Sequence, residues 1–232
     1  MGISTIGKYR IEYSNQEEFN IIFEEIFLDG IYIPKINKRN KDINIVDIGS
    51  HIGLSIIYFH SLFPLANIIG YEPNPILFKT LVQNIKKNSI ENVKLYNNAI
   101  DIEDRDIDFY ISANDDWFST GSPYKEQWKG KQIRKSINVK SLSIDNIFKE
   151  INEIDILKID IEGVEHRIIN QLVKYKDRIN NLIIEIHPTN NNEMENTLMN
   201  ISNVFKDITY IQNNKVIKSP KLTDIFIINA SN

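Results

Sequence analysis

The 232-residue chain contains no cysteine, which excludes disulfides, zinc–thiolate sites, iron–sulfur clusters and cysteine nucleophiles. It also lacks any run of about 18 apolar residues, so no membrane-spanning helix is predicted. Its first residues have neither the basic-then-apolar build of a signal peptide nor the myristoylation pattern, since Ile6 stands where Ser or Thr is needed. We therefore expect a cytoplasmic protein.

A strong charge of either sign is also missing. The 27 basic and 31 acidic side chains leave a net charge of −4, so general affinity for nucleic acid or anionic membranes is not expected. Apolar residues make up 42% and charged residues 25%, which excludes wholesale disorder and fibrous repeats. The length suits one domain with modest additions.

From residue 44 onward, short β-branched runs alternate with helical patterns. The predicted strands cover 44–48, 67–71, 93–96, 154–159 and 182–186, and the predicted helices cover 52–63, 76–87, 143–150, 164–175 and 193–205. This alternation predicts an α/β fold with a mostly parallel sheet between two helical layers. The last runs, 208–212, 215–217 and 224–228, leave no room for crossover helices, so we expect them to be antiparallel, with a tight turn at Asn213-Asn214.

Two segments stand outside this alternation. Residues 16–28 have apolar residues at helical spacing before Asp29-Gly30, which predicts an N-terminal extension over 1–42 that packs on a catalytic domain over 43–232. Residues 112–136 show no helix or strand period. Because long loops often bind ligands, we predict a substrate lid there, with Trp117 and Trp128 stacking on an acceptor. The alternative is a packed loop with solvated lysines. The basic residues of this segment also leave RNA open as an acceptor, although the net charge of −4 argues against it.

In open α/β sheets, ligands bind at the carboxyl ends of the strands. The first such turn is Asp47-Ile48-Gly49-Ser50-His51-Ile52-Gly53, where glycines let a ligand approach the backbone and point amides into the site. Asp47 would favour a ligand ammonium group. The dinucleotide pattern G-x-G-x-x-G is absent, and a plain strand–turn–helix is the alternative.

Polar side chains also follow the second and third strands. Glu72 lies 19 residues after Gly53, about the spacing at which an acid binds ribose hydroxyls, and the less favoured alternative is a solvated acid before two prolines. Asn98 could present its amide to an adenine edge, or be one of many asparagines without a role.

The fourth strand carries the densest group of charges. Lys158, Asp160 and Glu162 alternate with isoleucines, so they share one face at the end of a buried strand, before a helix N-terminus that offsets carboxylate charge. A helix cap with first-turn acids is the alternative. His187, at the end of the fifth strand, is a better candidate base than His60 or His166.

Three motifs resemble the FkbM family of S-adenosylmethionine-dependent methyltransferases. They are D-I-G-S-H-I-G from Asp47, Y-E-P-N-P from Tyr71 and D-I-L-K-I-D-I-E-G-V-E from Asp155. The segments 25–32 and 184–187 also match. The resemblance implies a class I methyltransferase fold, which is a Rossmann-like three-layer sandwich with a seven-stranded sheet. It further implies that the cofactor is bound by Asp47, Gly49, Ser50, His51, Gly53, Glu72, Asn98 and Asp160.

The family includes enzymes that methylate sugar or polyketide hydroxyls, so the resemblance implies O-methylation of a small-molecule or glycan acceptor. Asp160 would face the methyl group as base or orienter, with Glu162 and His187 as other catalytic candidates and Lys158 on the acceptor side. We predict no metal, with a divalent ion held by Asp160, Glu162 and His187 as the alternative.

Two other functions compete with this one. A nicotinamide-dependent oxidoreductase is disfavoured by the missing glycine pattern, and a non-catalytic nucleotide-binding module is disfavoured by the acids at the strand ends. The acceptor, the general base and the oligomeric state, for which we allow a homodimer, stay open.

Overall fold

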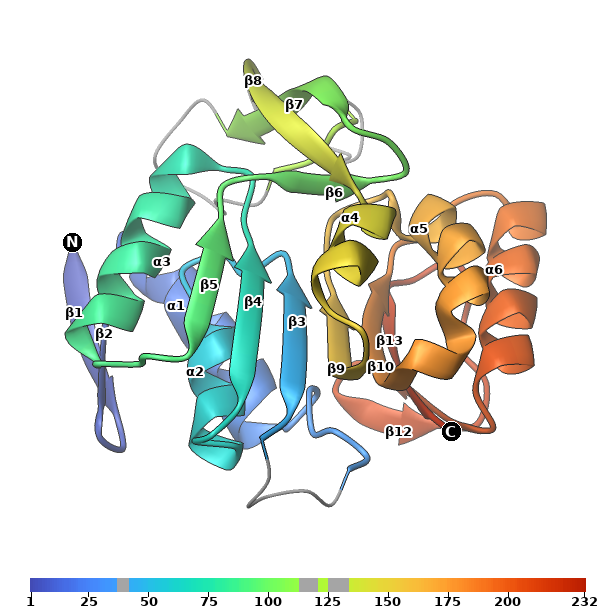
Figure 1. Cartoon of the computed structure of the whole chain (residues 1–232), viewed down its shortest axis with the longest axis horizontal. Helices are drawn as coiled ribbons and strands as arrows, with labels where there is room; N and C mark the ends of the chain where they lie inside the picture. The colour runs from blue at the N-terminus through green and yellow to red at the C-terminus, as the bar shows by residue number, and fades with distance from the viewer. Residues whose placement is uncertain (37–41, 113–120, 125–133) are drawn as a thin grey trace.

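The computed structural model describes residues 1–36, 42–112, 121–124 and 134–232. Its main sheet has the strand order β12-β11-β13-β10-β9-β3-β4-β5 (Figure 1). The strands are β3 (Asn44–Ile48), β4 (Asn67–Tyr71), β5 (Val93–Tyr96), β9 (Ile154–Ile159), β10 (Ile179–Ile186), β11 (Asp207–Gln212), β12 (Lys215–Ile217) and β13 (Phe226–Ser231). The first five are parallel, and β13 and β11 pair antiparallel, as predicted.

The sheet has one strand more than the seven expected. The extra strand is β12, a three-residue edge strand that pairs antiparallel with β11 across the Asn213-Asn214 turn. Both asparagines have φ near +50° (50° and 57°), which suits a tight hairpin turn.

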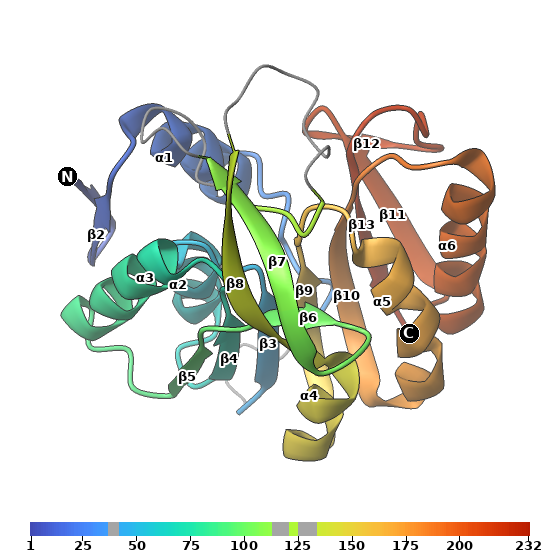
Figure 2. The same ribbon diagram turned by 90° about the horizontal axis from the view of Figure 1, so that it is seen from above.

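Helices cover both faces of the sheet and make the three-layer sandwich. On one face lie α1 (Gln16–Phe23), the π-helical turn η1 (Glu24–Leu28), α2 (Leu54–Leu62) and α3 (Pro75–Lys87). On the other lie α4 (Ile144–Glu150), α5 (Glu165–Leu172), the 3₁₀ turn η2 (Val173–Arg178) and α6 (Asn191–Val204) (Figure 2). Among the described residues, no helix has both the length and the apolarity to cross a membrane.

The strands contribute residues alternately to two hydrophobic cores, because successive side chains of a strand point to opposite faces of the sheet. Ile45 and Ile156 pack under α2 and α3, while Val46 and Leu157 pack under α4 and α5. The isoleucine-rich runs are therefore buried on both faces, as parallel strands between helices require.

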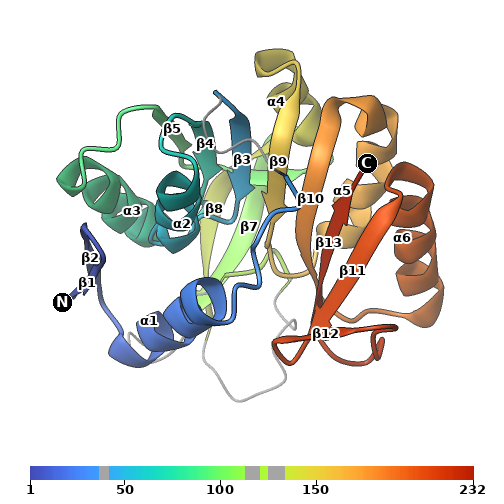
Figure 3. The same cartoon turned by 90° about the horizontal axis from the view of Figure 1, so that it is seen from below.

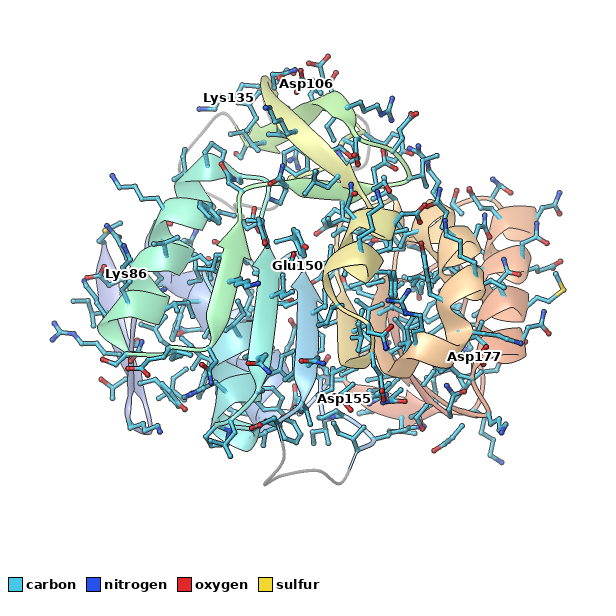
Figure 4. The ribbon with its side chains drawn as sticks, in the orientation of Figure 1. Lys86, Asp106, Lys135, Glu150, Asp155 and Asp177 are labelled. Atoms are coloured by element: carbon cyan, nitrogen blue, oxygen red, sulfur yellow. The ribbon has the colours of Figure 1, made fainter. Side chains whose placement is uncertain are left out.

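The strand order reverses between β3 and β9. The chain proceeds from β3 outward to β5 and then returns to place β9 against the free side of β3. Such a switch point leaves a crevice at the carboxyl ends of the two strands. Asp155, labelled in Figure 4, lies at the opposite, amino end of β9, where its Oδ2 accepts a hydrogen bond from Asn44 N (3.0 Å).

A second sheet of three strands lies above the carboxyl ends of β3 to β5 (Figure 1). It consists of β6 (Ala99–Asp101), β7 (Arg105–Ser112) and β8 (Arg134–Ser143), in the order β6-β8-β7. The prediction of an irregular segment over 112–136 is therefore wrong at its ends, since Ser112 closes β7 and Arg134 opens β8. Ser122 also forms a bridge with Tyr110. The remainder of that segment, with Trp117 and Trp128, lies outside the described residues.

The N-terminal segment begins with an unpredicted hairpin of β1 (Gly2–Ile6) and β2 (Tyr9–Tyr13), which lies beside α3 (Figure 3). Asn84 of α3 bonds the backbone of Glu12 through both its amide oxygen and its amide nitrogen (2.8 and 3.0 Å). The segment shares the core that contains α2 and α3, so it belongs to the same folded unit.

Candidate active site

A cavity of about 360 Å³ lies at the switch point. Its walls come from α1 and η1, the turns after β3 and β4, the ends of β9 and β10, and residues 98–101 at the start of the small sheet. Gly121 and Pro123 close part of it from the β7 side. The sequence predicted that the strand ends form this site, but it did not predict that α1 and the small sheet contribute to its walls.

Two glycines shape the turn after β3. Gly49 has φ +83°, and a Cβ there would lie 1.8 Å from the carbonyl oxygen of Asp160. Gly53 has φ +97°, and a Cβ would lie 2.7 Å from Leu81 Cδ1. Gly49 thus lets β3 and β9 meet at the cavity, while Gly53 does not line the cavity and instead packs the turn against α3.

The amides of this turn are already bonded within the protein. Gly49 N and Ser50 N both donate to Tyr71 O, at 3.0 and 2.9 Å, and His51 N donates to Glu72 Oε2 at 2.8 Å. The expectation that these amides point at a ligand is therefore wrong. Gly49, Ser50 and His51 still line the cavity with their other atoms.

Asp47 lies beneath the cavity rather than on its wall. Its side chain is fully buried, its Oδ2 accepts a hydrogen bond from Ser55 Oγ (2.6 Å), and its Oδ1 lies 3.2 Å from Lys158 Nζ. Lys158 also donates to Gly49 O at 2.6 Å. Burial lowers the pKa of Lys158, but the carboxylates of Asp47 and Asp160 outweigh it and raise the pKa, so the ammonium stays charged. The pair fixes β3 against β9 at the edge of the site.

Glu72 ends β4 on the cavity wall and is 5% exposed. Its two oxygens accept hydrogen bonds from His51 N and Asn74 N, both 2.8 Å. Burial raises the pKa of this carboxyl, although His51 and these backbone bonds oppose the rise. Asn98 lines the same region, and its Nδ2 donates to Lys140 O at 3.3 Å.

Three carboxylates face the other end of the cavity. Asp160 Oδ2 accepts a hydrogen bond from the Tyr32 hydroxyl (3.0 Å) and lies 3.6 Å from Lys158 Nζ. Burial raises the pKa of Glu185 well above its ordinary value, and Asp160 adds to this. Burial and Asp160 also raise the pKa of Glu25. This end of the cavity therefore gathers carboxyl groups whose ionisation is disfavoured in the ligand-free protein, and a cationic ligand group would favour their charged form.

Glu162 and His187 form a separate buried group beside these carboxylates. Glu162, with φ +56°, lines the cavity, and its Oε2 lies 2.7 Å from His187 Nε2. His187 is 4% exposed, and its other ring nitrogen lies 2.8 Å from Glu165 Oε1. His187 does not line the main cavity but a smaller hollow on its far side.

The structure brings most of the predicted residues to one place. Gly49, Ser50, His51, Glu72, Asn98, Lys158, Asp160 and Glu162 all line the cavity. Sequence reasoning missed Glu18, Glu25 and Tyr32, which come from the N-terminal segment, and Glu185. Within the described residues, no three His, Asp or Glu side chains are arranged to hold a metal ion, so Asp160, Glu162 and His187 do not form such a set.

Residues 47–212 match the family model described as the methyltransferase FkbM domain. The chain belongs to this methyltransferase family. The FkbM methyltransferases act with S-adenosylmethionine, which is the cofactor of this protein. The chain is therefore a methyltransferase and not the nicotinamide-dependent oxidoreductase that was the alternative.

The chain is also similar to individual proteins. The chain is 25% identical over 185 residues to "Methyltransferase 1" of Beauveria bassiana, covering 73% of this chain and 74% of that protein. It is 24% identical over 154 residues to "Hexuronic acid methyltransferase AglP" of Haloferax volcanii, covering 66% of this chain and 59% of that protein. The human METTL16 N-terminal domain, solved with SAH, is similar at a TM-score of 0.48 and 12% identity, covering 99% of this chain and 75% of that one.

Proposed function

We propose that this FkbM methyltransferase transfers a methyl group to a hydroxyl of a sugar, a glycan or another small natural product. The observation that carries the proposal is the Asp160 carboxylate, which faces the cavity at the switch point and is oriented by Tyr32. The hexuronic acid methyltransferase among the relatives supports a sugar acceptor.

Two ends of the cavity fit the two ends of the cofactor. Glu72 is a buried carboxylate with both oxygens oriented by backbone amides, so its remaining lone pairs suit ribose hydroxyls. Leu77 and Ile100 give the adjoining wall an apolar surface for the adenine. At the opposite end lie the carboxyl groups of Asp160, Glu25 and Glu185, whose ionised forms a bound sulfonium would favour.

The bound cofactor supplies an electrophilic methyl group on a cationic sulfur. The protein's part is to align the acceptor oxygen behind that methyl and to receive the hydroxyl proton as the oxygen–carbon bond forms. Asp160 is placed to hold this proton, because Tyr32 fixes one of its oxygens and leaves the carboxylate at the cavity surface. Asp47 and Lys158 act indirectly, by fixing β9 against β3.

The cofactor assignment is tested by calorimetry with S-adenosylhomocysteine and NAD on the wild type and on Glu72→Gln. We expect binding of S-adenosylhomocysteine only, weakened about 10- to 100-fold in Glu72→Gln, because a hydrogen bond to a charged group contributes about 1.5–3 kcal/mol. Glu91→Gln, at an exposed glutamate, is the matched control and should bind as the wild type does. Equal affinity in all three proteins contradicts the assignment of Glu72.

The acceptor class is tested by transfer of a labelled methyl group from S-adenosylmethionine into sugar, glycan and extract pools. We expect label in alkali-stable ethers and a fall of at least about 100-fold in Asp160→Asn, which removes a base but keeps its shape. Label in amines or esters only would contradict O-methylation. Cofactor binding without transfer to any pool would instead support the non-catalytic module. The homodimer and the cytoplasmic location stay predictions.

A further inference from the structure

Glu162 occupies the cavity wall in a conformation that needs support. Its φ of +56° lies in the left-handed region, which is strained for a non-glycine residue. Gly163 follows with φ +110°. The Glu162 carbonyl oxygen accepts a hydrogen bond from Ser122 Oγ at 2.7 Å, so the backbone is held from the side of the small sheet.

The carboxylate of Glu162 is held from the opposite side by His187. Both nitrogens of the His187 ring face carboxylate oxygens, with Nε2 2.7 Å from Glu162 Oε2 and Nδ1 2.8 Å from Glu165 Oε1. A neutral imidazole has only one N–H group, so one of these oxygens would face a nitrogen lone pair at contact distance unless that carboxyl itself carried the proton. Burial raises the pKa of Glu162, but the His187 ring lowers it, and an imidazolium directs one N–H group at each carboxyl.

Glu165 is in turn fixed by the turn that it follows. Both of its oxygens accept from Gly163 N, at 3.0 and 2.9 Å, and its side chain is fully buried at the start of α5. A single backbone N–H thus holds both oxygens of the Glu165 side chain, and the His187 ring is oriented on this fixed carboxyl group.

We propose that Glu165 and His187 are positioning residues that clamp the Glu162 carboxylate at the acceptor side of the cavity, with His187 as an imidazolium ion and not as a base. This inference rests on the proposed function, since Glu162 needs an acceptor to contact. The ring has no lone pair left with which to take a proton from a hydroxyl, and it does not line the cavity. Glu162 itself contacts the acceptor and orients its hydroxyl group.

The other charged groups around the ring agree with an imidazolium. Glu185 Oε1 lies 3.5 Å from Nε2, and although burial raises the pKa of Glu185, the His187 ring lowers it. Arg167, in the neighbouring hollow, is paired with Asp101 at 3.2 Å, and His166 Nε2 bonds the His187 carbonyl oxygen and not its ring. Burial lowers the pKa of His187, but Glu162 and Glu165 outweigh it and raise the pKa well above its ordinary value.

The charge on His187 is measured without an acceptor. In the 232-residue chain labelled with ¹⁵N-histidine, the four histidines give few enough ring signals to assign by single substitutions. At pH 8 we expect the His187 ring to carry protons on both nitrogens, and this signal should be missing in His187→Gln. His60→Gln, at a histidine that bonds Tyr9, serves as the assignment control. A singly protonated His187 ring at pH 7 overturns the proposal.

The clamp is tested in Glu165→Gln, with Glu193→Gln as the matched control in the same hollow. In Glu165→Gln we expect His187 to lose its second proton by pH 8 and, in a crystal structure, Glu162 to leave the cavity wall. Affinity for S-adenosylhomocysteine should stay within about twofold. With the acceptor found by labelled transfer, kcat should fall at least about tenfold with little change in KM for the cofactor.

The outcomes separate this inference from the proposed function. If no hydroxyl acceptor is methylated, the proposed function fails, while the nuclear magnetic resonance and crystal measurements still decide the clamp. An unchanged Glu162 side chain in Glu165→Gln overturns the clamp even if methyl transfer to hydroxyls is confirmed. If Glu165→Gln does not fold, the charge on His187 in the wild type decides.

Discussion

Individual carboxylates in the cavity destabilise the protein when they ionise without a ligand. Glu25 is the clearest example, because burial, followed by repulsion from Asp160 and Asp29, raises its pKa from the ordinary value of 4.5. Between that value and the raised pKa, the folded state binds more protons than the unfolded state. The free energy of unfolding therefore falls as pH rises through this window, and the loss is complete above it.

Glu25→Gln removes this penalty and keeps the size of the side chain. We expect the variant to be more stable than the wild type at pH 8 and equally stable at pH 4, as measured by urea unfolding. Glu24→Gln, at the exposed neighbouring residue, should match the wild type at both values. Equal stability of Glu25→Gln and the wild type at pH 8 would refute the explanation. If these carboxyl groups bind the sulfonium as proposed, the ligand should restore stability at pH 8 in the wild type more than in Glu25→Gln.

At the scale of elements, the site depends on the close contact between the ends of β3 and β9. Asp160 N donates to Ile48 O at 3.0 Å, and the Asp160 carbonyl oxygen occupies the space that a side chain on Gly49 would need. The glycine after β3 thus serves the contact between two strands as much as any contact with a ligand.

Gly49→Ala should separate the two strand ends. We expect it to lower the free energy of unfolding by roughly 3 kcal/mol or more, since steric overlap adds to backbone strain. Gly7→Ala is the matched control. Gly7 also has a positive φ, +55°, but nothing lies within 4 Å of a Cβ there, so only about 1 kcal/mol of strain is expected. Urea unfolding measures both values. Similar losses in the two variants would show that contact with Asp160 is unimportant.

How much the sequence could predict also differs from element to element. The βαβ units were predictable because each strand is a short buried run followed by a polar or glycine-containing turn. β8 was not, because its sequence RKSINVKSLS is mostly polar and few of its residues are buried. β8 is ordered by its antiparallel pairing with β7, in which the buried Ile107, Phe109 and Ile111 alternate with more exposed residues.

At the scale of the whole molecule, residues 1–36 and the class I fold share one core. Tyr9, Phe19 and Ile26 pack in the cluster that contains α2 and α3. In α2, six consecutive residues from Leu54 to Phe59 are buried, so the helix is covered on every side. A helix buried all round needs a partner on the side away from the sheet, and η1, which continues α1, provides it.

A chain that begins at residue 43 should therefore fail to form a native structure. We expect it to bind the dye ANS, to lose cooperative urea unfolding and to lose S-adenosylhomocysteine binding, because α2 and one wall of the cavity become exposed. Addition of a peptide of residues 1–42 is the control and should restore part of the cooperativity. A truncated chain with unchanged cofactor affinity would show that 1–42 is a dispensable extension.

The sequence by itself determined the α/β class, the switch-point turn and most of the strand-end residues that line the cavity. These features depend on local chemistry, namely strand periodicity and the glycines and acids that directly follow each strand. Only the tertiary structure decided that Tyr32 orients Asp160, 128 residues away, and that His187 lies between two carboxylates instead of facing a substrate. Such contacts depend on which distant surfaces pack together, and that packing is a property of the whole core, which no spacing along the chain specifies.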